Sequence, residues 1–156
     1  MRVLYNISTV FMVLALYFGT VVTAQAADTL WSVEQAQTKI EDGTALMLDI
    51  RTEQEWAETG IAKGAWPVSM HKADFGKNLQ SIIQNNPNKT IAIICATGGR
   101  TAYIMKILAK NNINDFVDVS EGMMGSAKGA GWIKKGLPIV SMNVAQTAVP
   151  LNFKAQ

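Results

Sequence analysis

Residues 90–110 read TIAIICATGGRTAYIMKILAK, and this segment decides the fold of the chain. Its first part contains Ile91 and Ile93 in a short apolar run rich in β-branched residues, which is typical of a strand buried inside a parallel sheet. Its last part places Met105 and Leu108 at helical spacing among other apolar residues. We therefore predict a buried strand, a six-residue loop and a helix.

The loop between these two elements has the composition of an anion-binding cradle. Gly98 and Gly99 allow positive φ and a tight curl, so that successive amide N–H groups point inward where the helix begins. Cys95, the only cysteine of the chain, opens the loop and Arg100 closes it. These donors favour a thiolate, so we expect Cys95 to be an exposed nucleophile at the rim of the sheet. A small buried core residue is the alternative for a single cysteine that ends an apolar strand.

The loop sequence CATGGRT, residues 95–101, resembles the active-site loop of single-domain rhodanese sulfurtransferases, which is Cys-x-x-x-x-Arg followed by Ser or Thr. The resemblance extends over about Trp31 to Val140. It includes four further segments: 49–56 (DIRTEQEW), 60–65 (GIAKGA), 120–123 (SEGM, with Glu121 where the family commonly has glycine) and 132–139 (WIKKGLPI). The second segment departs from the family pattern, because Ile61 and Ala62 replace a His-Ile pair.

The resemblance implies a rhodanese-like α/β domain over residues 27–140, with about five short strands in a mostly parallel sheet and helices on both faces. Hydrophobic patterns place further strands at 45–50, 66–68 and 116–119, and helices after Ser32 and around Phe75. Residues 141–156 have no clear period and contain Pro150, so we expect an extended or partly disordered tail there.

The first 26 residues differ from the rest of the chain and predict a signal peptide. Arg2 precedes an apolar core at 10–22, and Ala24-Gln25-Ala26 supplies small residues at the spacing that a signal peptidase prefers. We expect a periplasmic or secreted protein with no stable membrane span after cleavage; an uncleaved anchor is the alternative. An unpaired Cys95 in an oxidising compartment favours a reactive thiol.

The resemblance also implies the chemistry. Cys95 would attack the outer sulfur of thiosulfate, or of another persulfide or polysulfide donor. It would then carry the sulfur as a persulfide to cyanide or to a thiol, including a protein acceptor. No cofactor beyond this covalent persulfide is expected. The residues expected to contact the substrate are Ala96, Thr97, Gly98, Gly99, Arg100 and Thr101. Asp49 and Arg51 are interpreted as structural support for the neighbouring loops.

Charge and residue counts argue against several other functions. A net charge of +2 with mixed signs gives no basic stripe for nucleic acid. One histidine and one cysteine give no basis for a metal site. A thiol oxidoreductase would need a second cysteine. Cysteine phosphatases and arsenate reductases have five residues between Cys and Arg, whereas four separate Cys95 from Arg100 here.

Two interpretations stay open at this point. Because Ala96 and Thr97 are neutral, the domain could be a non-catalytic sulfur carrier or a redox sensor instead of an enzyme. The glycine-rich segment 124–131 could form a rim over the site, with Lys128 adding positive charge for an anionic donor, or it could be a flexible surface insertion.

Overall fold

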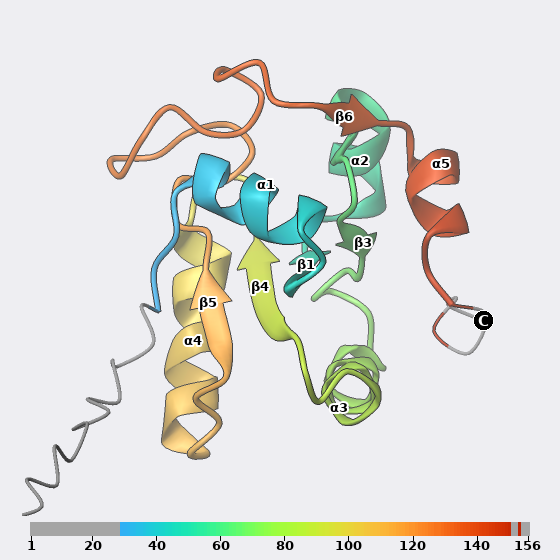
Figure 1. Ribbon diagram of the computed structural model, residues 1–156, viewed down its shortest axis with the longest axis vertical. Helices are drawn as coiled ribbons and strands as arrows, with labels where there is room; N and C mark the ends of the chain where they lie inside the picture. The colour runs from blue at the N-terminus through green and yellow to red at the C-terminus, as the bar shows by residue number, and fades with distance from the viewer. Residues whose placement is uncertain (1–28, 151–152, 154–156) are drawn as a thin grey trace, which may run out of the picture.

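The computed structural model describes residues 29–150 and residue 153, and its centre is a four-stranded parallel sheet (Figure 1). The strands lie in the order β3–β1–β4–β5. β1 and β4 pair in register over all five residues of each strand. The bounds of the four strands are β1 (Ala45–Asp49), β3 (Trp66–Pro67), β4 (Thr90–Ile94) and β5 (Phe116–Asp118).

Two smaller pairings lie at the margins of this sheet. Leu30 forms a parallel bridge to Asp118 and so extends the sheet beyond β5. β2 (Ile61–Ala62) pairs with β6 (Ile139–Val140) as a separate antiparallel ribbon. The predicted α/β fold with a mostly parallel sheet is confirmed, with four strands and one bridge in place of about five strands.

Helices cover both faces of the sheet. Met47 and Ala92 point to one face, and Leu48 and Ile93 point to the other, as the two-residue period of strands requires. Because both faces are covered, every residue of β1 is buried, and its sequence is apolar up to the terminal Asp49 instead of alternating. The first face packs against α1 (Val33–Glu41) and α2 (Glu53–Thr59), the second against α3 (Phe75–Asn85) and α4 (Gly99–Lys110).

Capping boxes start both helices of the first face. The Ser32 hydroxyl accepts the Gln35 N–H, and the Gln35 side chain accepts the Ser32 N–H in return, as the sequence spacing predicts. Thr52 and Glu55 make the same reciprocal contacts at the start of α2. The second box matters for the site, because it fixes the position of the Glu55 carboxylate.

Helix α4 begins earlier than a six-residue loop would allow. Gly99 is its first residue, and Gly98 is its N-cap with a φ of 81°. The loop therefore contains only residues 95–98, and Arg100 and Thr101 belong to the first turn of the helix. The left-handed backbone at Gly98 turns the chain sharply enough for the helix to start directly.

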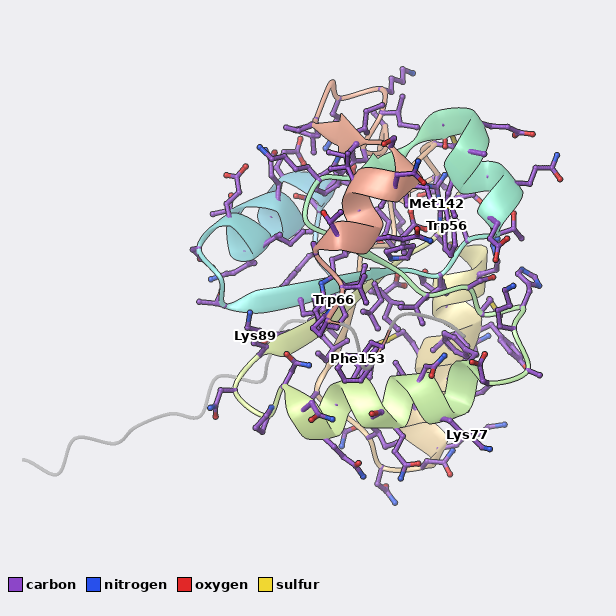
Figure 2. All side chains as sticks on the ribbon, turned by 90° about the vertical axis from the view of Figure 1, so that its right-hand side faces the viewer. Trp56, Trp66, Lys77, Lys89, Met142 and Phe153 are labelled. Atoms are coloured by element: carbon purple, nitrogen blue, oxygen red, sulfur yellow. The ribbon has the colours of Figure 1, made fainter. Side chains whose placement is uncertain are left out.

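Over residues 141–150, which the structure describes, the chain does not form the extended tail that its sequence predicts. Helix α5 (Met142–Thr147) forms there, and Ala145 and Val149 are buried in the core. Figure 2 shows Phe153 beside Trp66 of β3, with ring centroids 5.7 Å apart. Packing against the core stabilises a six-residue helix that is too short to form alone. Pro150 lies after its end and does not interrupt it.

None of the helices in the described part of the chain has the length and hydropathy needed to span a membrane. The predicted signal peptide, residues 1–26, falls outside the described residues. Cleavage and export therefore stay predictions.

Candidate functional site: the Cys95 loop

Cys95 directly follows β4, at the carboxyl edge of the parallel sheet, which is where such sheets bind ligands. Only 1% of the residue is exposed, and it joins the apolar cluster between the sheet and α3 and α4. Its Sγ accepts a hydrogen bond from the Gly98 N–H at 3.2 Å and lies 4.0 Å from Thr101 Oγ1. The prediction that the sulfur is exposed is therefore wrong, because the Cys95 side chain turns toward the covered face of the sheet.

The loop also carries backbone donors that are not used inside the protein. Among the described residues, the N–H groups of Thr97, Gly99 and Arg100 have no acceptor. Two of them lie in the first turn of α4, where the helix dipole adds positive potential. Such a set of amides suits an anionic group placed next to Cys95.

A second loop, residues 119–124, holds the Cys95 loop in shape. The Met123 N–H donates to the carbonyl of Cys95 at 2.8 Å. Gly122 has a φ of 72°, and a Cβ at this position would lie 2.4 Å from the carbonyl oxygen of Ala96. Since real Cβ contacts are never this short, only glycine permits the two loops to approach so closely.

Arg100 forms a two-pronged ion pair with Glu55 of α2. One Nη1–Oε2 contact measures 2.7 Å, and Nη2 pairs with Oε1. Glu55 also accepts the backbone N–H of Thr52 at 2.9 Å, so its carboxylate is held in place independently of Arg100. Sequence reasoning missed this residue. The Thr52–Glu55 capping spacing was visible, but the contact with Arg100 joins positions 45 residues apart.

Because Glu55 pairs with Arg100, the contribution of Glu55 to the stability of the fold depends on pH. The Arg100 hydrogen bonds lower the pKa of the Glu55 carboxyl to about 2. Because the folded pKa lies below the unfolded value of about 4.3, the contribution is complete above that value and is lost as the pH falls toward 2. We expect Glu55→Gln to lower the free energy of unfolding by about 1 kcal/mol at pH 7, and by less at pH 3.

Urea unfolding of the wild type and Glu55→Gln at both pH values measures this difference. Glu58→Gln, an exposed glutamate of the same helix, is the matched control and should change little at either pH. An equal loss for Glu55→Gln at pH 7 and pH 3 would contradict the assignment.

A family model described as Rhodanese-like domain matches residues 32–128 of the chain. The chain belongs to the rhodanese-like domain family. A rhodanese-like domain protein from Staphylococcus aureus is 28% identical with a TM-score of 0.53, over 72% of this chain and 99% of that protein. Rv0390 from M. tuberculosis is 21% identical with a TM-score of 0.50, over 70% and 94%, and shares the fold.

Two further relatives, which match a similar length of this chain, come from Rickettsia. The uncharacterized protein RP600 of Rickettsia prowazekii is 26% identical over 103 residues, which cover 62% of this chain and 84% of the relative. Its homolog in Rickettsia rickettsii is 25% identical over 108 residues, which cover 64% and 85%. The family membership supports sulfurtransferase-type or related chemistry, and these relatives do not narrow it to a substrate.

In this rhodanese-like domain, Asp49 and Arg51 form a buried ion pair at the end of β1. Nη2 of Arg51 lies 2.6 Å from Asp49 Oδ2, and the two side chains are 1% and 0% exposed. Arg51 also donates to Thr59 Oγ1 and to the carbonyl of Gly60, each at 2.7 Å. The pair therefore joins β1 to the end of α2, the helix that carries Glu55. Its supporting role stays a prediction, with a test given in the Discussion.

The glycine-rich segment 124–131 is a compact turn attached to the site loop. Its first residue, Met124, donates its N–H to the carbonyl of Ala96 at 2.9 Å. The Ser126 N–H donates to the carbonyl of Gly129 at 2.9 Å, which closes the turn, and the Ser126 hydroxyl donates to the carbonyl of Ser120 at 2.9 Å, which ties the turn to the 119–124 loop. Lys128 is exposed, and its ammonium contacts no partner in the described part of the chain. A rim role for Lys128 stays a prediction.

A groove of about 410 Å³ lies away from this site, between α2, α3 and α5. Trp56, Val68 and Phe153 contribute apolar surface to it. None of its described lining residues belongs to the Cys95 loop. This groove is therefore a surface separate from the Cys95 site.

Proposed function

We propose that the protein is a sulfurtransferase that carries sulfane sulfur as a persulfide on Cys95. The observation that carries this proposal is the hydrogen bond from the Gly98 N–H to Cys95 Sγ, at the positive end of α4. A backbone donor and a helix N-terminus lower the free energy of a thiolate relative to a thiol. A buried cysteine without such donors would serve only as a small apolar residue.

The reaction begins when the Cys95 thiolate attacks the outer sulfur of the donor. The new S–S bond forms as the bond inside the donor breaks, and sulfite or another anion leaves. Cyanide or a thiolate then attacks the terminal sulfur, and Cys95 departs as the thiolate. The unused amides of Thr97, Gly99 and Arg100 would stabilise the terminal sulfur anion by preorganised donation.

The ion pair between Arg100 and Glu55 affects which sulfur donor the loop would bind best. Because the carboxylate already neutralises the guanidinium, a doubly charged thiosulfate gains less attraction from the loop than it would from a free arginine. A persulfide or polysulfide donor, which carries less charge for each transferable sulfur, fits this loop better.

The burial of Cys95 favours a second candidate function. A thiol that is 1% exposed meets freely diffusing donors only when the loop opens. A domain that relays sulfur for a protein partner, or that senses redox state, needs little turnover with small donors. A slow cyanide-dependent reaction together with stoichiometric persulfide formation would favour this carrier role over the enzyme.

Mass spectrometry tests the proposal directly. Protein treated with polysulfide or thiosulfate should gain the mass of one sulfur atom, located on the peptide that contains Cys95. Cyanide should remove that sulfur and release thiocyanate. Protein whose thiol has first been blocked with iodoacetamide is the control and should gain nothing. Failure of the unblocked protein to gain sulfur from either donor would overturn the proposal.

A further inference from the structure

The arginine that follows the Cys95 loop already has an anionic partner, and that partner comes from a different element. Nη1 of Arg100 lies 2.7 Å from Oε2 of Glu55 on α2, and Nη2 pairs with Oε1. A guanidinium uses this same two-pronged geometry to bind the oxygen atoms of an oxyanion. The binding face of Arg100 is therefore occupied before any sulfur donor arrives.

Glu55 is held in position by contacts that do not involve Arg100. Its Oε2 accepts the Thr52 N–H at 2.9 Å and the Thr52 hydroxyl at 3.0 Å. The Glu55 N–H donates back to Thr52 Oγ1 at 3.2 Å, which completes the capping box of α2. If Arg100 turned away, the Glu55 carboxylate would keep these contacts. Its negative charge would therefore stay where it is.

The other acidic residues of α2 do not share this role. Glu53 pairs with Lys72 at 2.8 Å, and Glu58 accepts a hydrogen bond from the Gln54 side chain at 2.9 Å. Within the part of the chain that the structure describes, the acid paired with Arg100 is Glu55. The Arg100 side chain is 26% exposed, so a donor in solvent can approach it.

We propose that Glu55 determines which sulfur donors the site accepts, because it occupies the Arg100 guanidinium and so selects against dianionic donors. A dianion would have to break the two-pronged pair and would then lie near a carboxylate that stays in place. A monoanion can bind to the unused backbone N–H groups of Thr97 and Gly99 and leave the pair intact. The Coulomb repulsion from Glu55 is also twice as large for the dianion.

This inference rests on the proposed sulfur transfer and names the residue that sets its donor selectivity. Thiosulfate and methanethiosulfonate are suitable probes, because both offer one outer sulfur but the first is a dianion and the second a monoanion. Attack of the Cys95 thiolate on that sulfur breaks the S–S bond of either donor. Sulfite leaves from thiosulfate and methanesulfinate from methanethiosulfonate, and cyanide then removes the terminal sulfur as thiocyanate.

The first test compares kcat/KM for the two donors at pH 7. We expect Glu55→Gln to raise the value for thiosulfate about tenfold relative to the value for methanethiosulfonate, since losing one nearby negative charge favours the dianion more. Added salt should reduce this gain. Glu58→Gln removes the same charge from an exposed position of the same helix and should leave the ratio unchanged. An unchanged ratio in Glu55→Gln would overturn the inference.

Arg100→Met separates occupation of the guanidinium from charge repulsion alone. When Glu55→Gln is added to Arg100→Met, no guanidinium is released. We therefore expect the change in the donor ratio to fall to less than half of the change seen with Arg100 present. An undiminished change would show that Glu55 acts through its charge only and would overturn its hold on Arg100. Melting curves at pH 7 establish that each variant is folded.

Equilibrium binding provides a second test that needs no turnover. Cys95→Ser cannot take up sulfur, so calorimetry can measure the Kd of each donor in this variant with and without Glu55→Gln. We expect Glu55→Gln to lower the Kd of thiosulfate about tenfold more than that of methanethiosulfonate. This result, with a wild type that gains no persulfide, would contradict the proposed function and support the role of Glu55. Persulfide formation with an unchanged donor ratio would do the reverse.

Discussion

Cys95→Ser is expected to abolish sulfur transfer, with thiocyanate release from a sulfur donor and cyanide falling at least about a thousandfold, to the uncatalysed background. The hydroxyl occupies nearly the same volume as the thiol and can keep the contact with the Gly98 N–H. It cannot ionise near neutral pH or carry a transferable sulfur atom. The loss would therefore report chemistry and not a collapsed loop.

The assay compares initial rates for the wild type and Cys95→Ser with thiosulfate and with polysulfide. A melting curve of the variant establishes that it remains folded, and Ser126→Ala in the nearby glycine-rich turn is a control for general effects on that region. Activity that survives in Cys95→Ser would show that another group transfers sulfur. Persulfide formation on wild-type Cys95 without turnover would identify a carrier.

Arg51→Met is expected to have the largest effect on stability, a loss of about 3–5 kcal/mol in the free energy of unfolding. The change leaves the carboxylate of Asp49 buried at 0% exposure without its cation. It also leaves Thr59 and the carbonyl of Gly60 without their donor. Ionised groups are seldom tolerated in a protein interior unless they are paired, so the loss should be far greater than that of a surface pair.

Urea unfolding followed by tryptophan fluorescence measures this loss. Lys72→Met is the matched control, because it breaks a pair with Glu53 of similar length, 2.8 Å, whose side chains are 55% and 56% exposed. We expect that control to change the free energy of unfolding little, because water screens an exposed pair. The double replacement of Asp49 by Leu and Arg51 by Met should recover most of the loss, since no unpaired charge remains. A loss below about 1 kcal/mol for Arg51→Met alone would contradict a supporting role for the pair.

Local patterns were sufficient for much of the fold and for the position of the loop. The buried strand before Cys95, the capping box at Ser32 and the helix after the double glycine follow from hydrophobic period and backbone geometry within a few residues. Such features depend on neighbours along the chain, which is why a single sequence specifies them. The CATGGRT segment belongs to the same class, since the turn at residues 95–98 and the start of α4 at Gly99 depend on neighbouring residues.

Contacts between distant parts of the chain decided the remaining features. Glu55 pairs with Arg100, Gly122 of a second loop approaches the carbonyl of Ala96, and α5 forms because its apolar side chains reach the core. The burial of Cys95 likewise results from the way α4 packs on the sheet. Each of these depends on the register and packing of elements far apart in the chain, and residue types or spacing in one segment contain no information about that arrangement. The residue types therefore pointed to Cys95 as the candidate nucleophile, whereas packing decided the exposure of Cys95 and the partner of Arg100.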